Sequence, residues 1–167
     1  MLEGKKIIVT GSASGMGEAT LKAYVKAGAN VVGMDISDQK GKDISSNANN
    51  IGPGKCSFIH IDVSDKDSVK NAFDLALDEL KTLDVLAHPA AIQGPADASD
   101  VKVEDWDNMF AVNVRGTMLT NQTAFKYMKK NGSGSIINFG SISGLRPEPS
   151  ASAYSAAKGA VHSWTRT

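Results

Sequence analysis

Residues 5–17 read Lys-Lys-Ile-Ile-Val-Thr-Gly-Ser-Ala-Ser-Gly-Met-Gly, and the prediction of the fold starts from this stretch. Its first half is an apolar run typical of a buried strand, and its second half is a turn with the spacing Gly-x-x-x-Gly-x-Gly. Ala19, Ala23 and Ala27 follow at helical spacing, so the stretch predicts a strand, a tight turn and a helix. Such a turn is either purely structural or lets the backbone approach a diphosphate held on the helix N-terminus.

A second predicted strand, residues 29–34, ends at Asp35. An acidic residue about 20 residues after a glycine turn can bond the ribose hydroxyls of NAD and repel the 2′-phosphate of NADP. The alternative interpretation of Asp35 is an ordinary polar residue at a strand end.

Strand and helix patterns alternate along the whole chain. Short apolar runs lie at residues 5–10, 29–34, 56–61, 83–87 and 135–139. Between them apolar residues recur at helical spacing, strictly at Val69, Phe73, Ala76 and Leu80 and less strictly at Trp106, Phe110, Met118 and Phe125. Ser64 or Asp65 is the expected N-cap of the helix that contains Val69. We therefore predict one α/β domain over residues 1–167, a doubly wound, Rossmann-like parallel sheet with strand order 3-2-1-4-5. Its ligands should bind beyond the carboxyl ends of the strands.

Composition excludes several classes of function. Eighteen basic residues balance 18 acidic ones, so nucleic acid is not an expected partner. No apolar run approaches the ~20 residues of a membrane helix, and the N-terminal residues do not resemble a signal peptide. The single cysteine, Cys56, excludes an internal disulfide framework and favours a reducing compartment, so we expect a cytoplasmic protein. His60, His88 and His162 lack the spacing of metal ligands, and no metal site is expected.

Tyr154 and Lys158 are four residues apart in a predicted helix and should share one face. A phenol ionises only near pH ~10, and a neighbouring ammonium favours the phenolate. Such a pair can give a proton to, or take one from, an alcohol or ketone. Ser141, at the end of the fifth apolar run, could hold the substrate oxygen, with Ser143 as a nearby alternative.

Together these motifs resemble the short-chain dehydrogenase/reductase family. They are, in chain order, Thr10-Gly11-x-x-x-Gly15-x-Gly17, Asp35, Asp62-Val63, Asn113, Ser141 and Tyr154-x-x-x-Lys158. The resemblance implies an NAD(H)-dependent oxidoreductase that interconverts a small secondary alcohol and a ketone by hydride transfer. It also implies a homo-oligomer for the full-length chain.

The resemblance also implies roles for individual residues. The cofactor-binding set is Gly11, Ser14, Gly15, Met16, Gly17, Asp35, Ile36, Asp62, Val63, Ala90, Tyr154 and Lys158. The catalytic set is Asn113, Ser141, Tyr154 and Lys158, with Ser141 and Tyr154 touching substrate. Two members have structural alternatives: Asp62 could begin a helix instead of touching adenine, and Asn113 could be a buried structural amide instead of part of a water relay behind the lysine.

The sequence departs from the family pattern in two places. Where the family usually has Asn-Asn-Ala-Gly, this chain has His88-Pro89-Ala90-Ala91, which removes two amides beside the cofactor. Family members also continue past Thr167 into a substrate lid and further strands, so we expect the sequence to be part of a longer protein, with an open edge and an uncovered apolar face at its fifth strand. The alternative function is therefore a dinucleotide-binding module without turnover.

Overall fold

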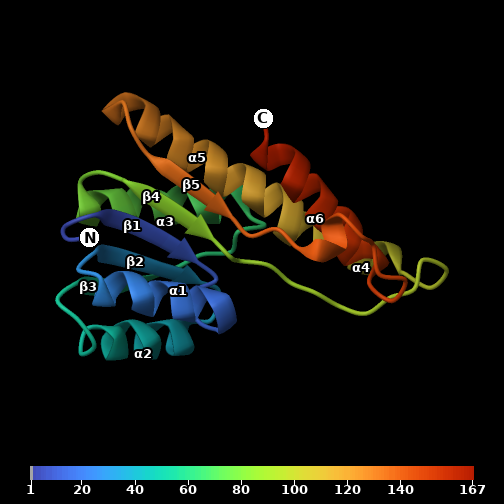
Figure 1. Cartoon of the computed structure of the whole chain (residues 1–167), viewed down its shortest axis with the longest axis horizontal. Coiled ribbons are helices and arrows are strands. Elements are labelled where there is room, and N and C mark those ends of the chain that lie inside the picture. The colour runs from blue at the N-terminus through green and yellow to red at the C-terminus, as the bar shows by residue number, and fades with distance from the viewer. Residues whose placement is uncertain (1) are drawn as a thin grey trace.

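Strands and helices alternate along residues 2–167, the part of the chain that this computed structural model describes (Figure 1). The strands are β1 (Lys6–Thr10), β2 (Asn30–Asp35), β3 (Lys55–His60), β4 (Val85–His88) and β5 (Ser135–Asn138). The longer helices are α1 (Gly15–Lys26), α2 (Asp38–Ala48), α3 (Lys66–Leu80), α5 (Gly116–Asn131) and α6 (Ser152–Thr165). Three shorter helical segments are α4 (Val103–Phe110), the π-helix η1 (Ala111–Arg115) and the 3₁₀-helix η2 (Ile142–Gly144). Each strand begins and ends close to the apolar run that predicted it.

All five strands are parallel and lie in the order β3-β2-β1-β4-β5, as predicted. In the central strand, Ile8 lies opposite Val32 of β2 on one side and Leu86 of β4 on the other. The carboxyl ends of the strands therefore meet at one edge of the sheet. The chain reverses its direction of winding between β1 and β4, which is where open α/β sheets bind their ligands.

The side chains of β1 alternate between two apolar layers. Ile7 and Val9 pack with Leu21 of α1 on one face, whereas Ile8 packs in a cluster with Phe73 of α3 on the other. Figure 1 shows α1 and α2 over the first face and α3 and α5 over the second. Because β1 is buried on both faces, its sequence is a continuous apolar run instead of an alternating one.

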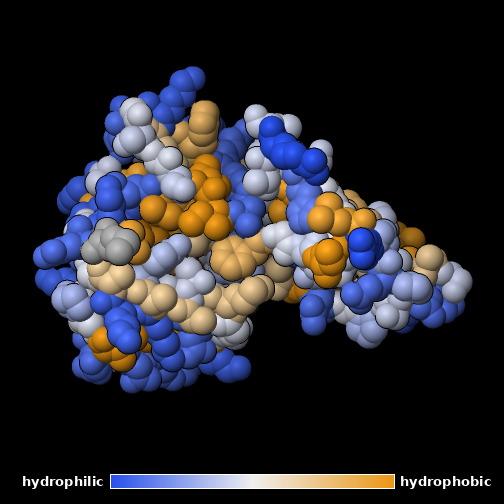
Figure 2. All heavy atoms as spheres, in the orientation of Figure 1, coloured by the Kyte–Doolittle hydropathy of each residue, from blue (hydrophilic) through white to orange (hydrophobic). Residues whose placement is uncertain are grey.

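Strand β5 forms an edge of the sheet. Ile136 packs into the cluster beneath α5, so its neighbour Ile137 points to the opposite face, where its side chain is 40% exposed. In Figure 1 no helix of residues 2–167 covers this face of β4 and β5, and Figure 2 shows hydrophobic atoms gathered there. The open edge and the uncovered apolar surface expected at the fifth strand are therefore both present.

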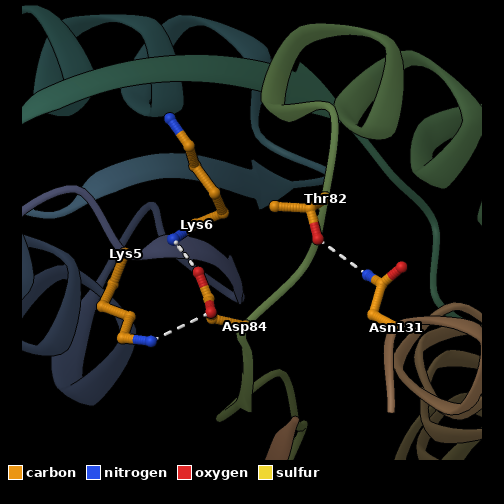
Figure 3. Close-up of polar contacts among 5 residues, drawn as sticks. All are labelled: Lys5, Lys6, Thr82, Asp84 and Asn131. Carbon is orange, nitrogen blue, oxygen red and sulfur yellow. Dashed lines mark hydrogen bonds and ion pairs between the residues drawn. The ribbon is translucent and has the colours of Figure 1, made fainter. Parts of the chain in front are cut away.

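At the amino end of the sheet, the carboxylate of Asp84, just before β4, is bonded to the start of β1. It accepts a hydrogen bond from the backbone N–H of Lys6 at 2.7 Å and forms an ion pair with Lys5 Nζ at 3.1 Å (Figure 3). Beside it, Asn131 at the end of α5 donates to the Thr82 hydroxyl at 2.7 Å. Burial alone would raise the pKa of Asp84, but the Lys6 N–H and the Lys5 ammonium outweigh burial and lower that pKa. These contacts lie at the end of the sheet away from the carboxyl ends of the strands.

Two helices show how local sequence is used. The carboxylate of Asp65 accepts from the Ser68 N–H at 2.6 Å, which confirms Asp65 as the N-cap of α3. Helix α2 is strongly polar, yet it forms because its buried positions are small residues that lie close to β3. A Cβ on Gly41 would stand 2.0 Å from the ring of Phe58, so glycine allows this close approach.

Helices α4 and α5 are joined without a loop by the π-helix η1, so residues 103–131 form one helical segment. Trp106 stacks on Phe110 with ring centroids 4.6 Å apart, but Trp106 is 37% exposed and Phe125 is 57% exposed. The looser helical spacing of these aromatic residues therefore correctly predicts helix but not a single buried face. The π-turn changes the angular relation between the two halves.

Candidate active site

A cleft of about 410 Å³ opens at the carboxyl ends of the strands, between the ends of β1 and β4. We call it the central cleft. It is lined by Gly11, Ser14, Gly15, Met16, Gly17, Asp35, Ile36, Ile61, Asp62, Val63, Pro89, Ala90, Ala91, Ile92, Gln93, Val112, Gly140, Tyr154 and Lys158. This set contains all twelve residues predicted to bind a cofactor.

The glycine turn is shaped by two close backbone approaches. Gly11 has φ +59°, and a Cβ there would lie 2.7 Å from the Cα of Ala90, at the other side of the cleft floor. A Cβ on Gly17 would lie 1.9 Å from the carbonyl oxygen of Gly11. Only glycine fits at both positions, so the turn brings backbone close to the cleft where α1 begins. The first N–H groups of a helix are free to bond an anion, and Met16 exposes 62% of its surface at this point.

Asp35 ends β2 beside this turn. One of its carboxylate oxygens accepts from the Ala13 N–H at 3.0 Å and the other accepts from the Ser37 N–H at 2.9 Å. These bonds fix the carboxylate between the glycine turn and the start of α2. The next residue, Ile36, lies at the cleft mouth and is 62% exposed. The negative charge is therefore held at one end of the cleft.

Asp62 and Val63 line the cleft just after β3. The Asp62 carboxylate accepts from both the N–H and the hydroxyl of Ser64, at 2.9 and 2.7 Å. Ser64 in turn accepts two hydrogen bonds from the Arg115 guanidinium through its carbonyl. Asp65 caps α3, and Asp62 lies in the turn that leads into it.

Tyr154 and Lys158 both reach the cleft from α6, one turn apart. Lys158 Nζ lies 5.7 Å from the centroid of the Tyr154 ring and donates a hydrogen bond to the carbonyl of Phe139 at 2.7 Å. Lys158 is 5% exposed, and this burial lowers the pKa of its ammonium. A phenol and an amine are thus brought together at the end of the cleft opposite Asp35.

Asn113 lies inside the π-helix η1 and is 1% exposed. Its Oδ1 accepts from the Ile92 N–H at 2.8 Å, and its Nδ2 donates to the Ile92 carbonyl at 2.8 Å and to the Met109 sulfur at 3.0 Å. Its side chain therefore anchors the loop after β4 and does not line the central cleft. Its face of the helix is shared with Met109, one turn before it.

Ser141 caps the 3₁₀-helix η2, one residue after Gly140, which lines the cleft. Its hydroxyl oxygen accepts from the Ser143 N–H at 3.2 Å, and its own N–H donates to His162 Nε2 at 3.2 Å. Ser143, the alternative residue, is buried and donates to Glu148. Ser141 borders the cleft, but neither serine is among the residues that line it.

The altered loop after β4 divides into a buried residue and a cleft wall. His88 is 3% exposed, and its Nδ1 lies 2.8 Å from the hydroxyl of Thr10. Burial and, to a lesser degree, the charge of Lys158 lower the pKa of His88 to about 3. Pro89, Ala90 and Ala91 line the cleft. The substitution thus places a neutral ring beneath the cleft floor and no side-chain amide on the wall.

Several residues of the cleft were not predicted from the sequence. Ile92 and Gln93 continue the loop after β4, Val112 comes from η1, and Gly140 follows β5. The rule that ligands bind beyond the carboxyl ends of strands would have included the loop residues that follow Ala91. Val112 carries no such signal, because its position depends on the π-turn.

Residues 2–167 contain no group of three or more His, Cys, Asp or Glu side chains that could hold a metal ion. None of the helices in this range is long and apolar enough to cross a bilayer. Cys56 is partly buried against the α1 face of the sheet, and this burial raises the pKa of its thiol.

Comparison with known proteins identifies the fold and the family. Two solved structures superimpose over 99% of this chain: a short chain dehydrogenase from Mycobacterium smegmatis, with a TM-score of 0.95 and 29% identity, and a 3-ketoacyl-(acyl-carrier-protein) reductase from Brucella melitensis in complex with NADH, with a TM-score of 0.91 and 30% identity. The chain covers 70% of the first protein and 68% of the second.

Curated relatives agree. A 3-oxoacyl-[acyl-carrier-protein] reductase of Thermotoga maritima is 34% identical over 166 residues, which are 99% of this chain and 67% of that protein. A cyclopentanol dehydrogenase of a Comamonas species is 35% identical over 162 residues, which are 97% of this chain and 64% of that protein. The chain thus spans about two thirds of the length of these relatives. The family model described as "short chain dehydrogenase" matches residues 5–167, and the chain therefore belongs to the short-chain dehydrogenase family.

Proposed function

We propose that this chain is the cofactor-binding and catalytic part of an NAD(H)-dependent oxidoreductase that interconverts a small secondary alcohol and a ketone. The observation that carries the proposal is the central cleft itself. It has a glycine turn and a helix N-terminus at one end and the Tyr154–Lys158 pair at the other. The names of the relatives support the same class, because they are reductases and a dehydrogenase.

The residues of the cleft fit a nicotinamide dinucleotide. The close approaches at Gly11 and Gly17 leave room for a diphosphate against the start of α1. Asp35 would accept from the adenosine ribose hydroxyls, and Val63 would lie against the adenine. Lys158 has N–H groups beyond the one that bonds Phe139, and these would hold the nicotinamide ribose. The NADH in the complex of the Brucella melitensis reductase supports this class of cofactor.

The chemistry needs one proton donor and one hydride carrier. When bound, the nicotinamide ring supplies or accepts the hydride. Tyr154 exchanges the proton with the substrate oxygen, and the Lys158 ammonium lies beside it, 5.7 Å from the centroid of its ring. The hydroxyl of Ser141 would donate its hydrogen to the same substrate oxygen while its own oxygen keeps the bond from the Ser143 N–H.

For Asn113 we propose a supporting role in proton relay behind Lys158. Both Nδ2 hydrogens are used by Ile92 and Met109, so only acceptor capacity remains on Oδ1. Its backbone carbonyl accepts from the Thr117 hydroxyl at 2.7 Å. These bonds hold Asn113 in place, and a water of the relay would have to donate to one of its carbonyl oxygens.

We propose NAD over NADP because the carboxylate of Asp35 is fixed at the position where a 2′-phosphate would add like charge. No basic side chain stands at Ser14 to compensate. We also propose a small-molecule substrate. A cytoplasmic location is proposed because the single cysteine, Cys56, is a free thiol, which suits a reducing compartment.

A homo-oligomer is also part of the proposal. A second groove of about 840 Å³ lies between the η1–α5 segment and α6, and its apolar lining includes Phe110, Val114, Met118, Val161 and Trp164. Exposed apolar grooves of this kind are typical of association surfaces. Sedimentation of the chain over a range of concentrations tests this part separately.

The alternative function is a dinucleotide-binding module without turnover. It is favoured by the absence of amides in the Pro89–Ala91 wall and by the position of Ser141 beside the cleft instead of in it. A paired experiment separates the two functions. NAD binding is measured by fluorescence of Trp106 and Trp164, and turnover is measured by the absorbance of reduced nicotinamide with a panel of secondary alcohols. Binding with turnover supports the enzyme, binding without turnover supports the module, and no binding contradicts both.

A further inference from the structure

The ring of His88 is held between β1 and α5 beneath the floor of the central cleft. Its Nδ1 lies 2.8 Å from the Thr10 hydroxyl and 3.3 Å from the Thr120 hydroxyl. Threonine hydroxyls can donate or accept, so these distances alone leave the position of the ring proton open.

The backbone of α5 limits what the Thr120 hydroxyl can do towards the ring. The Thr120 hydroxyl has one hydrogen, and it donates within its own helix, to the Gly116 carbonyl at 2.8 Å or the Thr117 carbonyl at 3.2 Å. Towards His88 it can therefore only accept, so its 3.3 Å contact is a hydrogen bond when the ring hydrogen is on Nδ1. In that tautomer Nε2 is a bare acceptor, because a neutral imidazole carries one ring hydrogen. Nε2 is buried and has no hydrogen-bond partner in residues 2–167.

Two further atoms of the same region share this property. Asn121 Nδ2 and Asn138 Oδ1 are buried without a partner in the described part of the chain. The orientation of Asn121 is fixed, because its Oδ1 accepts from Trp164 Nε1 at 3.2 Å and from Asn138 Nδ2 at 2.8 Å. Its Nδ2 is therefore a donor, and the unpartnered atoms of His88 and Asn138 are acceptors.

The fold brings these three side chains together. His88 and Asn138 are opposite each other in the register of β4 and β5 and point to the face covered by α5. Asn121 follows Thr120 on α5, and Thr120 contacts His88. One donor group and two acceptors are buried in the same layer between the sheet and α5 and have complementary polarity, and leaving them unpaired is costly in a protein interior.

This cluster lies where the walls of the central cleft begin. His88 leads directly into Pro89–Ala91, and Asn138 leads into Phe139, whose carbonyl holds Lys158. Asn138 also donates to Thr165 at 3.1 Å, which together with the Trp164 bond joins the cluster to the end of α6. Movement of the cluster would therefore move Lys158.

We propose that His88, Asn121 and Asn138 form a buried cluster that positions Lys158, in which Asn121 Nδ2 donates to His88 Nε2 directly or through one buried water. The three are positioning residues, since they reach the cleft through other groups. The inference rests on the proposed function insofar as Lys158 is taken to hold the cofactor.

The charges around His88 suit this arrangement. The side chains that contact it or pair with it from β1, α5 and β5 are Thr10, Thr120 and Asn138, which are uncharged. In residues 2–167 the charge that acts on it is that of Lys158 on α6, and burial and this charge both lower the pKa of His88. The ring therefore stays neutral and does not oppose the charge on Lys158.

The first test reads the ring directly and needs no cofactor. The chain has three histidines, so ¹⁵N-histidine labelling gives a simple long-range ¹H–¹⁵N spectrum, with His60→Gln and His162→Gln for assignment. We expect His88 as the Nδ1–H tautomer, unchanged between about pH 5 and pH 8. An Nε2–H tautomer, or titration in this range, would overturn the proposal.

The second test joins the cluster to the cleft. Asn121→Ala should shift the His88 Nε2 resonance and weaken NAD binding roughly tenfold, the effect of one buried hydrogen bond. Asn131→Ala, which removes the exposed amide bonded to Thr82 at the other end of the sheet, should change neither. Thr120→Val, which removes an acceptor for the Nδ1 hydrogen, gives a second variant should Asn121→Ala not fold, and it should alter the tautomer and NAD affinity.

The outcomes separate the two proposals. Failure of the wild-type chain to bind NAD, with the expected tautomer and its response to Asn121→Ala intact, contradicts the proposed function and leaves the cluster standing. Normal NAD binding by wild type and Asn121→Ala alike, with an unmoved His88 resonance, overturns the cluster and leaves the function standing.

Discussion

Lys158 Nζ donates a hydrogen bond to the carbonyl of Phe139 at 2.7 Å, which ties the middle of α6 to the end of β5. This bond satisfies part of the hydrogen-bonding capacity of a lysine that is 5% exposed. Burial lowers the pKa of the ammonium, and the carbonyl gives the buried amine a hydrogen-bond partner. The position of the charge next to Tyr154 is therefore set by the sheet as well as by the helix.

Replacing Tyr154 with phenylalanine should abolish most turnover. The ring and its packing remain, but the group proposed to exchange the proton is lost, so kcat should fall by about 10²–10⁴ with NAD affinity nearly unchanged. Tyr127→Phe is the matched control, because it removes a hydroxyl that bonds Asp74 of α3 and does not line the central cleft. This variant should keep normal rates. Steady-state kinetics on an alcohol that the wild type oxidises provides the measurement, and a Tyr154→Phe enzyme with near-normal kcat would refute the mechanism.

Lys158→Met should affect binding as well as turnover. The variant keeps the buried aliphatic stem but loses the ammonium that bonds Phe139 and is proposed to hold the cofactor ribose. We expect a tenfold or larger increase in the Kd for NAD, at about 1.4 kcal/mol per factor of ten, together with a lower kcat. Lys126→Met, at an exposed position on α5, should leave both unchanged. Equal NAD affinity in wild type and Lys158→Met would remove the ribose role.

Asp35→Asn should relax the choice between NAD and NADP. The substitution retains an oxygen acceptor for one backbone N–H but removes the charge, so the penalty on a 2′-phosphate should shrink roughly ten- to hundredfold. Isothermal titration with both cofactors gives the ratio directly. Asp67→Asn, in the exposed first turn of α3, serves as the control for net charge. If wild type already binds both cofactors equally, Asp35 does not select between them.

The buried His88 should make the fold less stable in mild acid. Its pKa is about 3 in the folded chain and about 6.5 in an unfolded one, so between these values the unfolded chain binds the additional proton. Above pH ~6.5 the titration of His88 should therefore not make the free energy of unfolding depend on pH. Below this value, the loss should be about 1.4 kcal/mol per pH unit.

His88→Asn lacks this titration and is the comparison. Urea unfolding at several pH values between about 7.5 and 5 should give a steeper loss for wild type than for the variant. The absolute stability of the variant is not the readout, since replacing a packed ring changes it at every pH. Parallel curves for the two proteins would show that His88 is protonated in the folded state or exposed.

Gly11→Ala should be strongly destabilising for a local reason. The added Cβ would meet the Cα of Ala90 at 2.7 Å, and φ at this position is +59°, so the cost should be about 1–3 kcal/mol or more. At Gly94 a Cβ has nothing within 4 Å, so Gly94→Ala should cost little. Thermal unfolding of the two variants measures the difference. Similar melting temperatures would mean that the turn and the loop after β4 do not pack as closely as described.

Much of the fold could be predicted because the central strands β1 and β2 are buried on both faces. Runs such as residues 5–10 are then continuous and easy to recognise. The glycine turn after β1 and the alternation of strands with helices predicted the type of sheet, whose strand order the structure confirms. Helix α2 was harder, because its burial depends on small residues against Phe58 and not on an apolar stripe. The residues predicted to bind a cofactor came from the resemblance of the motifs to a family, and the structure brings all of them to the central cleft.

The remaining details depend on three-dimensional contacts that spacing does not encode. That Asn113 bonds Ile92 follows from a π-turn, which has no distinct sequence signature here. Ser141 has the expected place after β5, but its hydroxyl oxygen is used by the Ser143 N–H. His88 could be recognised as unusual but not as buried beside Asn121, because that requires the register of β4 with β5 and the position of α5.

The π-helix at Ala111–Arg115 has a consequence for how this segment can vary in length. A π-turn accommodates one residue more than an α-turn, so deleting any one of these five residues would let α4 and α5 merge into a regular α-helix. Because the π-turn already takes up the additional residue, the deletion would leave α4 and α5 close to their present orientation, whereas losing a residue from a regular α-helix would rotate the preceding part by about 100°. Asn113 lies in the π-turn, so its bonds to Ile92 would change. This stretch is therefore the place where the helix can lose one codon while its two halves keep their faces, although the bond that anchors the loop after β4 would be disturbed.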